Sequence, residues 1–111
     1  MAKAGPFITD PKAGAYCWIT LDSGEKVIVN HDQGGFKGGR ITLEVSKLMG
    51  FSSDRIFACD LDSPEGKAAI AQLTRNAPAG SVQATPLGAF VELAMGCPSA
   101  AEVKRRCAAL V

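Results

Sequence analysis

The sequence lacks long apolar runs, an excess of charge of one sign and Cys-x-x-Cys motifs, and each lack is informative. No apolar stretch approaches the roughly 18 residues of a membrane-spanning helix, and residues 1–12 lack the apolar core of a secretory signal. Twelve basic residues against 11 acidic ones leave a formal charge of +1, so no overall field favours nucleic acid or an anionic membrane. We expect a soluble, cytoplasmic protein with no membrane partner.

Cysteine pairs of the kind that bind zinc or exchange disulfides are also missing. The four cysteines, at positions 17, 59, 97 and 107, form no Cys-x-x-Cys motif. Three of them fall on the apolar phase of predicted elements, which favours buried free thiols in a reducing compartment. A catalytic cysteine needs a neighbouring base, and His31 is the sole histidine. The sequence therefore predicts neither a metal nor a cofactor.

The length of 111 residues matches one domain with one hydrophobic core. Residues 1–14 contain Gly5, Pro6, Pro11 and Gly14 without sustained periodicity, so we expect a flexible lead-in there. We expect residues 15–111 to form a single α+β domain, because strand patterns precede helix patterns along the chain.

Three segments have strand patterns. Residues 15–30 contain two β-branched and aromatic runs around Asp22-Ser23-Gly24-Glu25, which predicts a β-hairpin. Residues 40–46 alternate apolar and polar side chains, which favours a strand, although the same residues also fit a helix that ends at Gly50. Residues 55–61 form a further strand. Together they predict a mostly antiparallel sheet of about four strands.

The rest of the chain has helix patterns. Ser63 as N-cap and Pro64 at the first helical position predict an amphipathic helix over residues 64–76. Thr85 opens a second helix, and Ser99 with Glu102 has capping-box spacing before a third. Residues 86–110 are therefore predicted to form an αα-hairpin that packs on the sheet.

The segment from His31 to Arg40 is rich in glycine and contains positive charge. Such a loop can direct backbone N–H groups at an anion, with charged side chains beside them. The spacing from Gly34 to Gly39 is that of a phosphate-binding P-loop, but Arg40-Ile41 replaces the required Lys and hydroxyl residue, so we reject nucleotide hydrolysis. An ordinary connecting loop remains the alternative. The candidate ligand-binding residues are Gly34, Gly35, Lys37, Gly38, Gly39 and Arg40.

Two further groups of charged residues have a functional and a structural explanation. Asp60 and Asp62 follow a strand and precede a helix, where carboxylates bind cations or simply complement the helix dipole. Lys104, Arg105 and Arg106 are consecutive, so they point in different directions around a helix, which indicates a solvated helix face.

Tyr16 and Trp18 share one face of the first predicted strand, while Cys17 and Ile19 share the other. If Cys17 and Ile19 face the core, the two aromatic side chains lie on the outer face, where they can form a partner interface. If the phase is reversed, they belong to the core. The pattern leaves both alternatives open.

The leading functional hypothesis is a non-enzymatic binding or protein-interaction module that uses the glycine loop and the aromatic face. A homodimer is one form that such a module can take. The rival is a small enzyme for an anionic substrate, with His31 as acid or base and Asp60 or Asp62 holding a cation. It requires His31 and Asp60 in one cleft. A third alternative, nucleic-acid binding, requires Lys37, Arg40 and the basic run on one surface.

Overall fold

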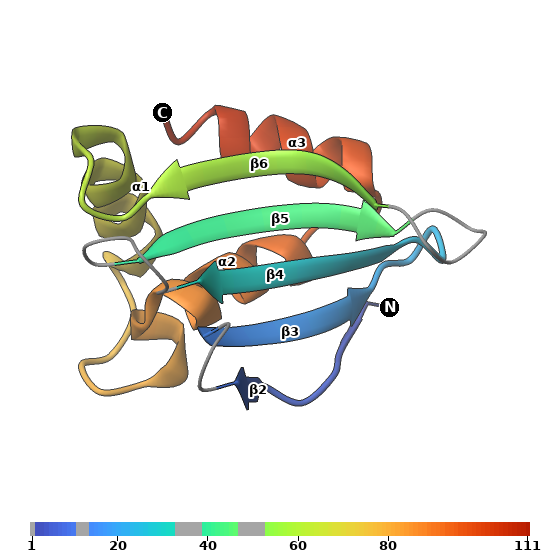
Figure 1. The fold of residues 1–111 in the computed structure, drawn as a ribbon, viewed down its shortest axis with the longest axis horizontal. Helices are drawn as coiled ribbons and strands as arrows, with labels where there is room; N and C mark the ends of the chain where they lie inside the picture. The colour runs from blue at the N-terminus through green and yellow to red at the C-terminus, as the bar shows by residue number, and fades with distance from the viewer. Residues whose placement is uncertain (1, 11–13, 33–38, 47–52) are drawn as a thin grey trace.

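A computed structural model describes residues 2–10, 14–32, 39–46 and 53–111 of the protein. Figure 1 shows an antiparallel sheet with helices packed behind it, as seen from the open side of the sheet. The predicted α+β class, with strands before helices, is therefore confirmed.

Within the described ranges the sheet has six strands, and every paired neighbour is antiparallel. The order is β1-β3-β4-β5-β6, with β2 pairing with β3 beside β1. The strand bounds are β1 (Lys3–Ala4), β2 (Ile8–Asp10), β3 (Gly14–Thr20), β4 (Lys26–Asp32), β5 (Arg40–Ser46) and β6 (Ser53–Asp60).

The expected count of about four strands was too low. The two additional strands, β1 and β2, lie within residues 1–14, where we predicted a lead-in. Each has three residues or fewer, so neither is long enough to show the alternation by which strands are recognised. The predicted hairpin of residues 15–30 is confirmed as β3 and β4.

Residues 40–46 form strand β5, so the helical alternative is wrong for them, and residues 47–49 lie outside the described ones. The strand conformation is favoured over a helix because both edges of β5 are paired, with β4 on one side and β6 on the other. A strand in this position buries Ile41 and Leu43 on a single face. A helix would not, because side chains two positions apart share a face in a strand but not in a helix.

Three α-helices and one short 3₁₀-helix follow the sheet: α1 (Pro64–Thr74), η1 (Val82–Ala84), α2 (Pro86–Met95) and α3 (Ala100–Ala108). The predicted caps are confirmed, because the side chains of Ser63, Thr85 and Ser99 accept hydrogen bonds from backbone N–H groups three residues on. Helix α1 ends two residues before the predicted boundary. The predicted αα-hairpin is confirmed as α2 and α3.

The core lies between the sheet and the helices. Most inward side chains of β3, β4 and β5 are fully buried, and Phe90 of α2 and Val103 of α3 cover them from the helical side. The ring of Phe90 stacks on Phe57 of β6 with 5.7 Å between the ring centroids. No described helix packs against the opposite face of the sheet (Figure 1). The fully buried strand residues are Cys17, Ile19, Val27, Val29, Ile41 and Leu43.

Candidate functional site

The helix-free face of the sheet is the most distinctive surface of the domain. Cys17 and Ile19 are completely buried, whereas Trp18 between them is 41% exposed and Tyr16 is half-buried. Alternation along β3 therefore places the two aromatic side chains on the outer face. This answers the question that the sequence left open, since the core takes Cys17 and Ile19.

Further apolar side chains lie beside these aromatic residues. Ile8 of β2 is 39% exposed and pairs with Tyr16, so the two side chains share the outer face. In the other direction Trp18 lies opposite Ile28 of β4. The aromatic half of the face thus extends from the N-terminal segment to the middle of the sheet.

The remaining half of the face is charged. The cross-strand row that begins with Trp18 and Ile28 continues through Glu44 of β5 to Arg55 of β6. Directly opposite residues of an antiparallel sheet point to the same side, so Arg55 shares the outer face with Trp18. No local sequence pattern connects these two residues, because only the register brings them into one row.

Most of the predicted glycine-loop site, namely Gly34, Gly35, Lys37 and Gly38, lies outside the described residues. Gly39 is described, and it is buried with a φ of +92°, a conformation that side chains disfavour. A Cβ atom there would lie 2.5 Å from Nε2 of His31. The backbone at Gly39 therefore closes over the imidazole, which explains why glycine is needed at this position.

Arg40 forms an ion pair with Asp60. Its Nε lies 3.5 Å from a carboxylate oxygen of Asp60, and the register pairs the two residues across β5 and β6. Asp62, two residues further on, forms a longer ion pair of 3.9 Å with Lys67. Among the described residues no group of three metal-ligating side chains comes together, so the structure adds nothing in favour of a cation at Asp60 and Asp62.

His31 and Asp60 lie at the same end of the sheet but do not meet. The register places His31 opposite Ile41, and Ile41 opposite Cys59, so His31 shares the helix-covered side with Cys59. Asp60 is the next residue and points to the other face. His31 and Cys59 are two strands apart, or about 10 Å. This geometry supports neither an acid–base pair nor a Cys–His pair.

The environment of His31 is that of a half-buried side chain at the end of a strand. Its Nε2 atom is screened from solvent and has no hydrogen-bond partner among the described residues. An imidazole nitrogen in that position is costly to leave unsatisfied, by about 1–3 kcal/mol. The adjoining chain from position 33 to 38 lies outside the described residues, so the nitrogen marks no site on its own.

The four thiols are free, and burial is the largest influence on the pKa of each. Burial raises the pKa of Cys107 to about 12, and it also raises the pKa of Cys17, Cys59 and Cys97. A raised pKa keeps a thiol protonated, and a protonated thiol is a poor nucleophile. The expectation of buried core thiols is confirmed for Cys17, Cys97 and Cys107, while Cys59 is half-buried.

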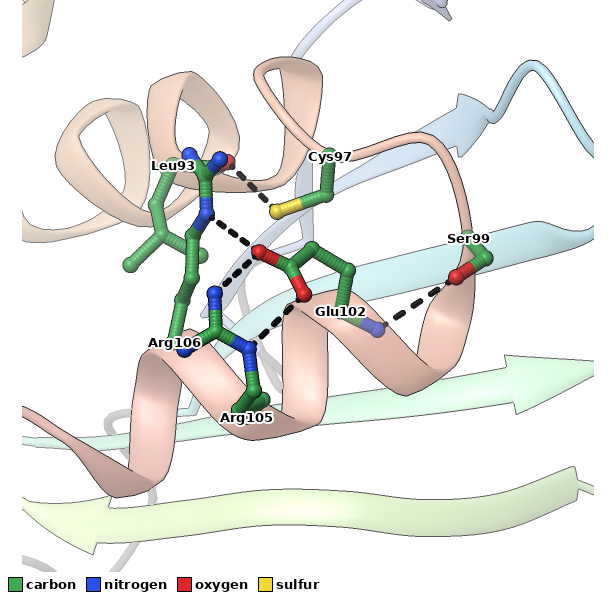
Figure 2. Close-up of polar contacts among 6 residues, drawn as sticks. All are labelled: Leu93, Cys97, Ser99, Glu102, Arg105 and Arg106. Atoms are coloured by element: carbon green, nitrogen blue, oxygen red, sulfur yellow. Dashed lines mark hydrogen bonds and ion pairs between the residues drawn. The ribbon is translucent and has the colours of Figure 1, made fainter.

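The basic run on α3 is partly neutralised by a neighbouring carboxylate. Figure 2 shows Glu102 between Arg105 and Arg106, with Nε-to-oxygen distances of 2.8 and 3.1 Å. Hydrogen bonds from Arg105 and then Arg106 lower the pKa of Glu102 to about 2. Lys104 is exposed. The run therefore offers less positive charge to a nucleic acid than its sequence suggests.

Comparison of the chain with protein families, curated proteins and solved structures gave no match. No helix in the described part of the chain is long and apolar enough to cross a membrane. The helix-free face is the surface of the described residues on which exposed aromatic and charged side chains come together.

Proposed function

We propose that this domain is a non-enzymatic protein-interaction module that self-associates through the helix-free face of its sheet. The observation that carries the proposal is the exposure of Trp18, 41% of which is open to solvent on the same face as the exposed Ile8. Tryptophan, tyrosine and arginine are the residue types that dominate binding energy at protein interfaces. All three occur on this face, as Trp18, Tyr16 and Arg55.

A second copy of the chain is a suitable partner because the face is complementary to itself. A two-fold axis that runs between the facing sheets, parallel to the strands and midway between β4 and β5, places Trp18 of each copy opposite Arg55 of the other. A guanidinium group over an indole ring is attractive, and desolvation strengthens the attraction. One axis thus produces this contact twice.

The area is also sufficient for a dimer. Strands of seven to eight residues across β3 to β6, together with β2, form a face of roughly 550–600 Å² from standard strand spacings. Two such faces in contact bury about 1,100 Å² or more, which exceeds the roughly 1,000 Å² that a specific interface needs. Self-association of moderate strength is therefore expected.

Sedimentation equilibrium tests the proposal directly. The wild-type protein is expected to dimerise, and both Trp18→Ala and Arg55→Ala are expected to weaken the dimer, by about tenfold or more for Trp18. Val82→Ala is the matched control, because Val82 is 54% exposed on the helical side of the molecule. Trp18 is the only tryptophan, so the fluorescence of the protein reports on it alone. Its emission should shift to the blue when the dimer forms, and the shift should reverse on dilution.

Two results would contradict the proposal. One is a monomer at every concentration up to about 1 mM, the weak end of specific association. The other is a dimer whose dissociation constant is unchanged by Trp18→Ala, since the assembly would then use a different surface.

A further inference from the structure

Strand β6 forms one edge of the sheet. Its residues pair with β5 on one side, and no described strand pairs with its other side. Half of the backbone N–H and C=O groups of an edge strand point away from the sheet, and such groups can accept a further strand. The position of these groups along β6 follows from the hydrogen bonds at its end.

The outward groups belong to Ala58 and Asp60. The N–H of Leu61 donates to the carbonyl oxygen of Gly39 at 3.0 Å, which makes Gly39 and Leu61 a hydrogen-bonded pair. Hydrogen-bonded and non-bonded pairs alternate in an antiparallel ladder, so Phe57 and Cys59 also direct their backbone groups to β5. Ala58 and Asp60 therefore direct theirs outward.

An independent contact agrees with this assignment. The carbonyl oxygen of Asp60 accepts hydrogen bonds from the N–H of Ser63 at 3.1 Å and from its hydroxyl at 2.6 Å, and Ser63 lies beyond the end of the sheet. No described residue bonds to the N–H or C=O of Ala58, or to the N–H of Asp60. These three groups are the free part of the edge.

A cleft of about 380 Å³ opens along this same stretch of β6. Residues 57–60 of β6 line it, together with Arg40 of β5, Ser63 and Glu65 at the start of α1, and Val111. The lining therefore includes Ala58 and Asp60, whose outward backbone groups form the edge. The volume of the cleft lies in the range of ligand-binding pockets.

The side chains around the cleft define the chemistry of the occupant. Phe57, Cys59 and Val111 offer apolar surface, so alternate residues of the occupant should be apolar. Asp60, whose side chain is 54% exposed, and the exposed Glu65 contribute two carboxylates against the single guanidinium of Arg40. A basic residue opposite Asp60 is therefore favoured.

We infer that the cleft beside β6 binds an extended peptide segment of a partner protein as an additional antiparallel strand. In this arrangement a small polar residue exchanges two backbone hydrogen bonds with Ala58, apolar residues flank it, and a lysine or arginine faces Asp60 and Glu65. Strand addition of this kind draws affinity from the backbone and specificity from alternate side chains. The site lies at the β6 edge of the sheet, three strands away from Trp18 on β3.

The probe is a capped hexapeptide of sequence Thr-Lys-Val-Thr-Val-Thr. In antiparallel register its Lys lies opposite Asp60, and its fourth residue, called the central Thr below, lies opposite Ala58. Binding is measured by amide shifts and hydrogen exchange of the full chain. The N–H groups of Ala58 and Asp60 are expected to become protected. Methylating the amide nitrogen of the central Thr removes the donor to Ala58, so affinity should fall by about fivefold to tenfold.

Variants of the protein test the same contacts from the other side. Ala58→Pro removes an outward N–H without breaking a bond to β5, and edge strands tolerate proline in this orientation. It is expected to abolish binding of the peptide while circular dichroism shows the fold intact. Asp60→Asn with Glu65→Gln should weaken binding and flatten its dependence on salt. Trp18→Ala is the control and should leave peptide affinity unchanged.

The inference fails if the peptide causes no shift at about 1 mM, where weak specific binding is visible. It also fails if the N-methylated peptide binds as well as its parent, a comparison that does not depend on the folding of any variant. A dimer that Ala58→Pro dissociates would overturn it in another way, because the occupant would then be a second copy of the chain. Loss of dimerisation with Trp18→Ala bears on the proposed function alone.

Discussion

The two faces of the sheet are built from the same strands but have opposite environments. Along β3 the inward residues Cys17 and Ile19 are completely buried under helices, whereas the outward Trp18 keeps two fifths of its surface exposed. The larger, aromatic side chain is thus the exposed one. Burial follows from which face the helices cover, and the size or hydropathy of the side chain does not decide it.

We therefore expect substitutions on the inner face to change stability, and those on the outer face to change the self-association proposed above. Buried apolar area stabilises a domain by roughly 25 cal/mol per Å², and the inner side chains contribute nearly all of theirs. The outer side chains contribute the rest only when something covers them. Substitutions on the two faces should therefore separate stability from association.

Truncation of a core ring should have the largest effect. Phe90 is completely buried and stacks on Phe57, so Phe90→Ala is expected to lower the free energy of unfolding by about 3–5 kcal/mol. Trp18→Ala should cost about 1 kcal/mol in the monomer, because much of the indole is already in water. Urea unfolding at low protein concentration measures both. Similar losses for the two variants would contradict the assignment of the faces.

The close approach of α2 to the preceding backbone should have the second largest effect. A Cβ atom at Gly88 would lie 1.9 Å from the carbonyl oxygen of Val82, so Gly88→Ala is expected to cost about 2–3 kcal/mol. Gly24 has a φ of +87° and no atom near its missing Cβ, so Gly24→Ala should cost about 1 kcal/mol from backbone strain alone.

Thermal unfolding of both glycine variants makes this comparison. If Gly88→Ala is neutral or stabilising, as alanine is in an uncrowded helix, then α2 does not contact the preceding segment so closely. The covered side of the domain would in that case tolerate more rearrangement than the packing indicates.

Local patterns in the sequence predicted the elements that are defined by local physics. The hairpin of residues 15–30 follows from two β-branched runs around a short turn, and the helix starts follow from Ser63-Pro64 and Thr85-Pro86. Strand β5 was the ambiguous case, because alternation and a helical stripe both fit residues 40–46. Pairing on both edges decides between them, and pairing is not visible in one strand.

The candidate sites were harder to predict because they depend on register and strand order. Trp18 and Arg55 are 37 positions apart, and only the ladder through β4 and β5 puts them in one row. The free edge at Ala58 depends on β6 being the outermost strand. The rival enzyme hypothesis required His31 beside Asp60, but the same ladder directs these two side chains to opposite faces.

The smallest expected effect concerns a contact that joins the hairpin turn to the helical layer. A carboxylate oxygen of Glu25 accepts a hydrogen bond of 3.0 Å from the N–H of Ala100, at the start of α3, and another of 2.7 Å from the hydroxyl of Ser23. These bonds, the one from Ala100 first, lower the pKa of Glu25. The capping-box spacing had suggested Glu102 for a role at this helix start, but Glu102 bonds to Arg105 and Arg106.

A group whose pKa is lower in the folded state stabilises the protein above its unfolded pKa, near 4.5, and loses that effect as the pH falls through the folded value. Glu25 is exposed, so solvent screening limits the contribution to about 0.5 kcal/mol. Glu25→Gln should therefore be less stable than wild type by about that amount at neutral pH, and the gap should close below pH 4.5. Glu92→Gln, an exposed substitution on α2, is the control, and urea midpoints across the pH range measure the difference. A gap that persists unchanged in acid would mean that Glu25 acts through packing, and that the turn is not held to α3 by charge.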